Sequence, residues 1–216
     1  MGHAPTCPRC GGSVRPPGLW NSAWQCAEHG SVAPLHILQH PGAEALDHVT
    51  RLAKVPVWRP VGLGAAWGCS GVAFAGDERD GARATVTASS GPSPLGGPAD
   101  LLLVAEEPGV GLGAHLAGMS GVDPGERIAS GSPDGRVVAA RHPTALWPMS
   151  AAPIESSESD RAAFVGEAMG FWLWLIVWPA TAGVLVYDGV ELVDHRQGDA
   201  TVVDLTFGAL TPRLSA

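Results

Sequence analysis

Beyond about its first 60 residues, the chain consists of short apolar runs separated by turn residues, a pattern typical of a sheet-rich domain. The runs Trp67–Phe74 and Arg83–Ser89 flank the polar segment 76–81, which has the length of a hairpin loop. Asp100–Ala105 and Val137–Ala140 predict further strands. We therefore expect an α+β fold, built on a mostly antiparallel sheet with one or two helices.

Two segments have a helical pattern. Between Pro41 and Ala53, the apolar residues Leu46, Val49 and Ala53 recur at helical spacing, and they predict a short helix. A second helix is predicted from Ser159 or Asp160, either of which can act as an N-cap, through Gly170.

The segment Ala168–Tyr187 has twenty residues and no charge, the length needed to cross a bilayer. Pro179 and Gly183 interrupt it, and no cluster of Lys or Arg flanks it. We therefore predict no membrane span, but two buried strands, Phe171–Trp178 and Gly183–Tyr187. The first is apolar on both faces, as in a central strand covered on both sides. Asp188-Gly189 then predicts a hairpin turn.

The N-terminal stretch differs from the rest, since it is rich in Cys, Gly and Pro but poor in the Leu, Ile and Val that build a core. Burial alone cannot stabilise a segment of this kind, which needs a cross-link or a metal. We expect three regions: a zinc ribbon at residues 1–36, a short helix and linker at residues 37–60, and an α+β body at residues 61–212.

The strongest chemical signal is the pair of motifs Cys7-Pro8-Arg9-Cys10-Gly11-Gly12 and Cys26-Ala27-Glu28-His29-Gly30. Two such turns, each followed by glycine, bring four ligands around one tetrahedral zinc ion. The predicted ligands are Cys7, Cys10, Cys26 and His29. Because all four positions are filled by protein, the zinc is expected to be structural rather than catalytic. A redox Cys-x-x-Cys pair is the alternative, but it expects a thioredoxin-like βαβ context that is missing.

Composition narrows the partners and the compartment. The net charge of −8, from 13 Lys+Arg against 21 Asp+Glu, makes nucleic acid an unlikely partner. Arg9, Arg15 and Trp20 are the residues of the ribbon expected to be exposed, and they suit a protein surface. Three of the four cysteines are clustered, which fits metal ligands in a reducing compartment, and no signal-peptide pattern begins the chain. We expect a cytoplasmic protein.

The run from Gly109 through Gly111 and Gly113 follows a strand and matches G-x-G-x-x-A, a pattern that can seat a phosphate at the start of a helix. The neighbouring acids would repel a phosphate, and a loop that needs positive φ explains the glycines equally well. A small-ligand site here remains an alternative. Its residues would be Gly109, Gly111, Gly113, Glu106, Glu107 and His115.

The segments TCPRCGG, WQCAEHG, GDERDG, SGPSPLGG, VAEEPGVGLGAHLAG and FWLWLIVWP together resemble an uncharacterised actinobacterial family, a domain of unknown function with a zinc-knuckle head. The resemblance covers roughly Thr6 to Leu214 and implies that head and body belong together. It implies no activity, and no residue set supports a catalytic assignment.

We therefore expect a zinc-binding adaptor that contacts a protein partner through its Trp-rich face or through loops 90–98 and 108–118. The alternative is a small-ligand binder or an enzyme that uses loop 109–118. Loop 118–135 receives no role.

Overall fold

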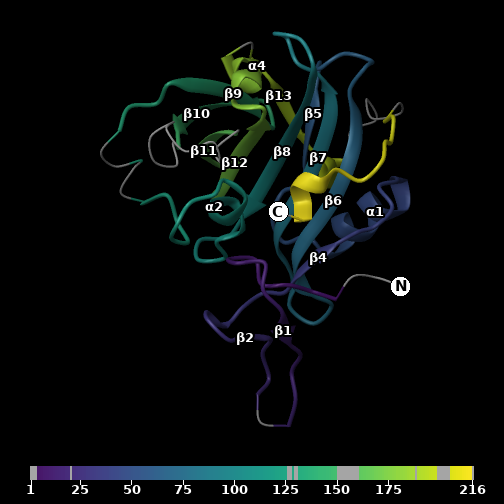
Figure 1. The fold of residues 1–216 in the computed structure, drawn as a ribbon, viewed down its shortest axis with the longest axis vertical. Helices are drawn as coiled ribbons and strands as arrows, with labels where there is room; N and C mark the ends of the chain where they lie inside the picture. Colours follow the sequence, from purple (N-terminus) through teal and green to yellow (C-terminus); the bar gives the residue numbers. More distant parts are fainter. Residues whose placement is uncertain are drawn as a thin grey trace.

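A computed structural model describes residues 4–19, 21–125, 128, 131–149, 161–187, 189–198 and 205–215 (Figure 1). The strands in the N-terminal region and at the start of the main sheet are β1 (Val14–Arg15), β2 (Gln25–Cys26), β3 (Gly30–Ser31) and β4 (Leu35–Ile37). The remaining strands are β5 (Trp58–Val61), β6 (Gly68–Asp77), β7 (Gly81–Pro92), β8 (Pro98–Glu106), β9 (Gly135–Ala139), β10 (His142–Pro148), β11 (Ala162–Ala168), β12 (Phe171–Trp178) and β13 (Glu191–Asp194). The helical elements include α1 (Ala43–Leu52), α2 (Leu112–Leu116), η1 (Ala180–Gly183), α4 (Val184–Tyr187), η2 (His195–Gln197) and η4 (Pro212–Ser215).

In the described part of the chain, ten strands form one sheet in the order β4-β6-β7-β8-β12-β11-β10-β9-β13-β5. Among these strands, only β13 and β9 pair in parallel. Short β1, β2 and β3 form a separate three-stranded sheet. The predicted sheet-rich, mostly antiparallel α+β fold is therefore confirmed. The hairpin of β6 and β7, with its turn after Asp77, is where the polar segment between two apolar runs predicted it.

The sheet curls so that its last strand, β5, lies over β7. The hydroxyl of Thr85 donates to the carbonyl of Pro56 at 2.6 Å, and the hydroxyl of Thr87 donates to that of Trp58 at 2.5 Å. One apolar core fills the space enclosed by the curl, and a second lies on the opposite face beneath α2.

The middle strand β12 contributes to both cores, with Trp174 and Ile176 on one face and Leu173 and Leu175 on the other. The prediction of a central strand at Phe171–Trp178 is confirmed, because apolar residues on both faces require cover on both faces.

The first predicted helix is present as α1. Its buried residues Leu46 and Val49 pack into a third apolar cluster with Val72 and Phe74 of β6. Helix α1 lies at the edge of the body beside β6 (Figure 1).

The second predicted helix is wrong, because Ala162–Ala168 is the strand β11, paired along its length with β12. Met169 (φ 58°) and Gly170 (φ 83°) form the turn that joins β11 to β12. Two consecutive residues with positive φ are characteristic of a type I′ hairpin turn. Cross-strand pairing with β12 therefore overrides the local helical pattern.

The predicted strand Gly183–Tyr187 is also wrong. This segment forms the end of η1 and the short helix α4, whose Leu185 and Val186 cover the core inside the curled sheet. The predicted turn at Asp188 lies partly outside the described residues, and a helix rather than a strand precedes Gly189. Among the described residues, no helix has both the length and the apolar character needed to span a membrane.

The N-terminal segment that contains the small sheet, residues 4–31, forms an arm at one end of the body (Figure 1). Strand β4 contains the predicted boundary at residue 36, and β5 contains the one at residue 60. Both strands belong to the ten-stranded sheet, so the sheet draws residues from all three predicted regions. The division into three regions itself stays a prediction.

Candidate metal centre

The four predicted ligands lie on two tight turns of the N-terminal arm. In the first turn, the N–H of Cys7 donates to the carbonyl of Gly12 and the N–H of Gly11 donates to that of Cys7. In the second, Cys26 ends β2 and pairs with Gly30 at the start of β3. Gly11 and Gly30 have φ of 68° and 66°, which explains why glycine follows each ligand pair.

These turns bring the donor atoms of Cys7, Cys10, Cys26 and His29 within 4.8 Å of one another. Cys10 Sγ and Cys26 Sγ are 3.8 Å apart, while His29 Nδ1 is 3.6 Å from both Cys7 Sγ and Cys26 Sγ. A tetrahedral ion bound by sulfur at about 2.3 Å and by nitrogen at about 2.0–2.1 Å has S···S edges of about 3.8 Å and S···N edges of about 3.6 Å. The residues therefore fit a metal ion bound by three thiolates and one imidazole.

The surroundings shift the pKa values of the two buried thiols, Cys7 and Cys26, in opposite directions. Burial raises the pKa of Cys7. Burial acts the same way on Cys26, but the backbone amides of Glu28 and His29 outweigh it and lower the pKa of that thiol. Backbone N–H groups that point at a sulfur stabilise a thiolate, the form that binds a metal.

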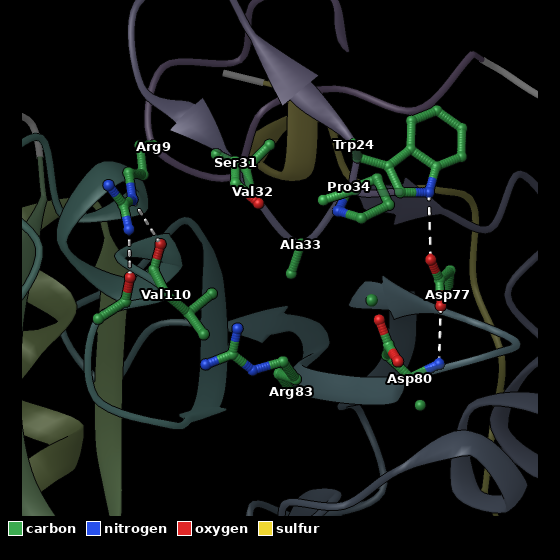
Figure 2. Close-up of a pocket in the computed structure, with 14 residues that line it drawn as sticks. Arg9, Trp24, Ser31, Val32, Ala33, Pro34, Asp77, Asp80, Arg83 and Val110 are labelled. Atoms are coloured by element: carbon green, nitrogen blue, oxygen red, sulfur yellow. Dashed lines mark hydrogen bonds between the residues drawn. The ribbon is translucent and has the colours of Figure 1, made fainter. Parts of the chain in front are cut away.

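The same turn that carries two ligands also binds the body. The Arg9 guanidinium lies between Cys7 and Cys10 in sequence and donates to the carbonyls of Gly109, at 2.5 Å, and Val110, at 3.2 Å. Figure 2 shows this contact on one side of a cavity between the arm and the body. The expectation that Arg9 is an exposed contact residue is therefore wrong, because the side chain is half-buried and its guanidinium binds two carbonyls of the body. Trp20 lies outside the described residues, and Arg15 is exposed.

A second contact lies on the other side of that cavity, where the indole N–H of Trp24 donates to Asp77 Oδ2 at 3.2 Å (Figure 2). Asp77 is positioned by its own turn, because its other oxygen accepts the backbone N–H groups of Arg79 and Asp80. The cavity between the two contacts has a volume of about 130 Å³. The arm is thus fixed to the body at two separate points.

Residues 1–214 match the model of a family described as a family of unknown function, DUF6758. The chain belongs to this family. No curated protein and no solved structure matches it.

In this DUF6758 protein, backbone amides at the end of the glycine-rich loop bind the carboxylate of Glu106. Glu106, at the end of β8, is 0% exposed and accepts the N–H groups of Leu112 and Gly113 at the start of α2. Its other oxygen accepts the indole N–H of Trp174 at 2.7 Å. The amides that could seat a phosphate therefore face Glu106. Burial raises the pKa of Glu106 to about 7, even though these three donors favour the charged form.

The other predicted residues of this loop lie apart from that carboxylate. Glu107 pairs with Arg83 at 2.7 Å, and the N–H of Gly109 donates to Asp123 Oδ1. His115 lies beside the first ligand turn, where a side chain at Gly11 would come within 3.5 Å of its ring. Gly111 has φ of 84° and precedes α2, as the alternative explanation of a loop with positive φ expects.

Gly113 is glycine for a different reason, since a Cβ there would lie 2.2 Å from Trp174. Loop 108–118 is thus part of the junction between arm and body, where Gly109 and Val110 line the cavity beside Arg9. The small-ligand site on this loop stays a prediction. The sequence signal for this arrangement is the period-two pattern of β8, which puts Glu106 on the same face as the buried Leu102 and Val104.

Proposed function

We propose that this protein is an adaptor in which a structural zinc ion holds the N-terminal arm folded, so that the arm docks on the body and presents its tip to a protein partner. The donor set favours zinc, because three thiolates and one imidazole in tetrahedral geometry are typical structural zinc ligands. Four protein ligands leave no position for water or substrate, which argues against a catalytic metal.

The single observation that carries the adaptor role is the exposure of Leu19. This residue is 99% exposed at the tip of the arm, between the bridged residues Gly18 and Asn21. The arm extends away from the ten-stranded sheet (Figure 1). A fully exposed leucine gains nothing in the folded protein, whereas apolar side chains at the centre of an interface contribute strongly to binding.

We further propose that the protein works in the cytoplasm. The four cysteines are free thiols, three of them grouped as ligands, and this use of cysteine is typical of a reducing compartment.

Site-specific photo-crosslinking tests the adaptor role. A photoreactive amino acid at position 19 should form a discrete crosslinked species in cells, and Cys26→Ser should abolish it. Leu95, 68% exposed in the loop between β7 and β8, and the exposed Arg79 provide matched positions on the body. Crosslinks at position 95 but not at 19 would move the interface to loop 90–98. Equal crosslinking of position 19 in Cys26→Ser would refute the role of zinc.

A further inference from the structure

A second cavity lies on the body, away from the metal centre. Its volume is about 400 Å³. It is lined by three residues of β5, the segment that follows β5, the start of β6, one residue of β7, and two residues near the C-terminus. Cavities that hold small molecules have volumes of about 300–1,000 Å³. The lining residues are Arg59–Ala65, Trp67, Gly68, Cys69, Ser89, Leu205 and Thr206.

The unusual residue of this cavity is Arg59. It is only 6% exposed, and its buried Nε has no hydrogen-bond partner. One terminal nitrogen lies 3.5 Å from His195 Nδ1, which offers a neutral acceptor. Within the described ranges, no carboxylate lies within ion-pair distance of Arg59.

Two other arginines of the body each have a carboxylate nearby. Arg196 pairs with the buried Asp194 at 2.7 Å, and Arg213 lies 3.6 Å from Asp100. Burial lowers the pKa of Arg59, and a charge on the thiol of Cys69 would oppose this effect. Burial raises the pKa of that thiol, so it stays protonated near neutral pH and supplies no negative charge. A buried cation without a counter-ion is costly, which indicates that an anion completes the site.

The rest of the lining defines the kind of anion. Leu63, Trp67 and Leu205 line the same cavity as Arg59 and provide apolar surface there. An inorganic ion would leave this surface exposed to water, whereas an anion that carries an apolar group would cover it. Guanidinium groups bind carboxylate and phosphate oxygens with particular strength.

We propose that this cavity binds an organic oxyanion, a carboxylate or phosphate carried on an apolar group, with Arg59 as its counter-ion. The inference is independent of zinc and of the arm. A negative result for this cavity would therefore leave the adaptor role untouched, and the reverse also holds.

Fluorescence titration with 8-anilinonaphthalene-1-sulfonate, an oxyanion on an aromatic group, tests the proposal on the full-length protein. Octanoate and octyl phosphate should displace the dye, and their relative affinities distinguish carboxylate from phosphate. Octanol and inorganic phosphate, which each carry half of the expected ligand, should displace it at least tenfold more weakly.

Arg59→Met removes the charge but keeps most of the volume, and should weaken dye and octanoate binding at least tenfold. Its melting temperature should equal or exceed that of the wild type, because it removes an unpaired buried charge. Arg59→Gln serves the same purpose if the methionine variant does not fold. Arg79→Gln changes an exposed arginine outside the cavity and should bind as the wild type does.

Four results would overturn the proposal. They are wild-type protein that binds neither dye nor octanoate, unchanged affinity in Arg59→Met, displacement by octanol or inorganic phosphate as strong as by octanoate, and an affinity gain of tenfold or more in Asp204→Asn. The last variant tests an internal competitor, because Asp204 carries a negative charge and precedes the lining residue Leu205 in sequence.

Discussion

The N-terminal arm and the body illustrate two different ways of stabilising a chain. Of the described residues 4–31, only Cys7, Pro8 and Cys26 are buried, and two of these three are predicted metal ligands. In β12 alone, six of eight residues are buried, between two apolar cores. The body is therefore stabilised by the hydrophobic effect, whereas the arm depends on its ligand set. A perturbation of the metal should unfold the arm and leave the body intact.

The largest effect is expected for Cys26→Ser, which removes one of the four predicted ligands. Binding free energies of structural zinc are about 10–16 kcal/mol, far more than the arm gains from burial, so the arm should unfold. Limited proteolysis should cut within residues 7–31, while tryptophan fluorescence should show a cooperative transition of the body.

Cys69→Ser is the matched control, since Cys69 is a buried cysteine of β6 that belongs to the body. It should leave the arm resistant to protease and lower only the stability of the body. Arm cleavage equal to that of the wild type in Cys26→Ser would show that burial stabilises the arm after all.

The next largest effect is expected for Glu106→Gln, which replaces the buried carboxylate between β8 and α2 and should change how stability depends on pH. Its folded pKa of about 7 exceeds its ordinary value of 4.5, so the folded state binds more protons than the unfolded state between these pH values. The stability of the wild type should therefore fall as pH rises from 4.5 to 7, by roughly 3 kcal/mol relative to Glu106→Gln, which cannot ionise.

Denaturant unfolding of both proteins at several pH values measures this difference, and the subtraction cancels groups that the two proteins share. A difference that stays constant from pH 4.5 to 7 would contradict the raised pKa.

A smaller effect is expected for Arg9→Met, which removes the hydrogen bonds to Gly109 and Val110 but no metal ligand. Hydrogen bonds from a charged donor contribute about 1.5–3 kcal/mol, so docking of the arm should weaken by about that amount. Hydrogen exchange should show faster exchange at the junction of arm and body, with metal content unchanged. Loss of the metal in this variant would mean that docking and metal binding are inseparable.

The smallest effect on stability is expected for Leu19→Ser, which changes a side chain that touches almost nothing. Its melting temperature should match that of the wild type, corresponding to a change within about 0.5 kcal/mol. A clear drop in melting temperature would place Leu19 in the folded core of the arm and remove the main support for the adaptor role.

The grouping of Cys7, Cys10, Cys26 and His29 was predictable because the spacing rule is local. Two ligands three residues apart, followed by glycine, restrict the backbone so strongly that the spacing predicts the turn. The central strand was equally clear, because Phe171–Trp178 is apolar on both faces.

Ala162–Ala168 was not predictable in the same way, because seven residues with a polar cap before them fit both a helix and a strand. Its pairing with β12 and the positive-φ turn at Met169-Gly170 decide the matter, and both depend on the partner strand. The sequence did not reveal that Glu106 accepts hydrogen bonds from the glycine-rich loop. Its position beside a phosphate-binding pattern suggested only that its charge would repel a phosphate. In the fold, its carboxylate instead receives the amides of α2 and the indole of Trp174.

The central claim is that one zinc ion is bound by Cys7, Cys10, Cys26 and His29 as a structural element. Elemental analysis of protein purified without added metal, combined with zinc-edge X-ray absorption, tests it most directly. The account predicts one zinc per chain, coordinated by three sulfurs at about 2.3 Å and one nitrogen at about 2.0 Å, and its loss in Cys26→Ser. Wild-type protein with no bound metal and four reactive thiols would contradict the account.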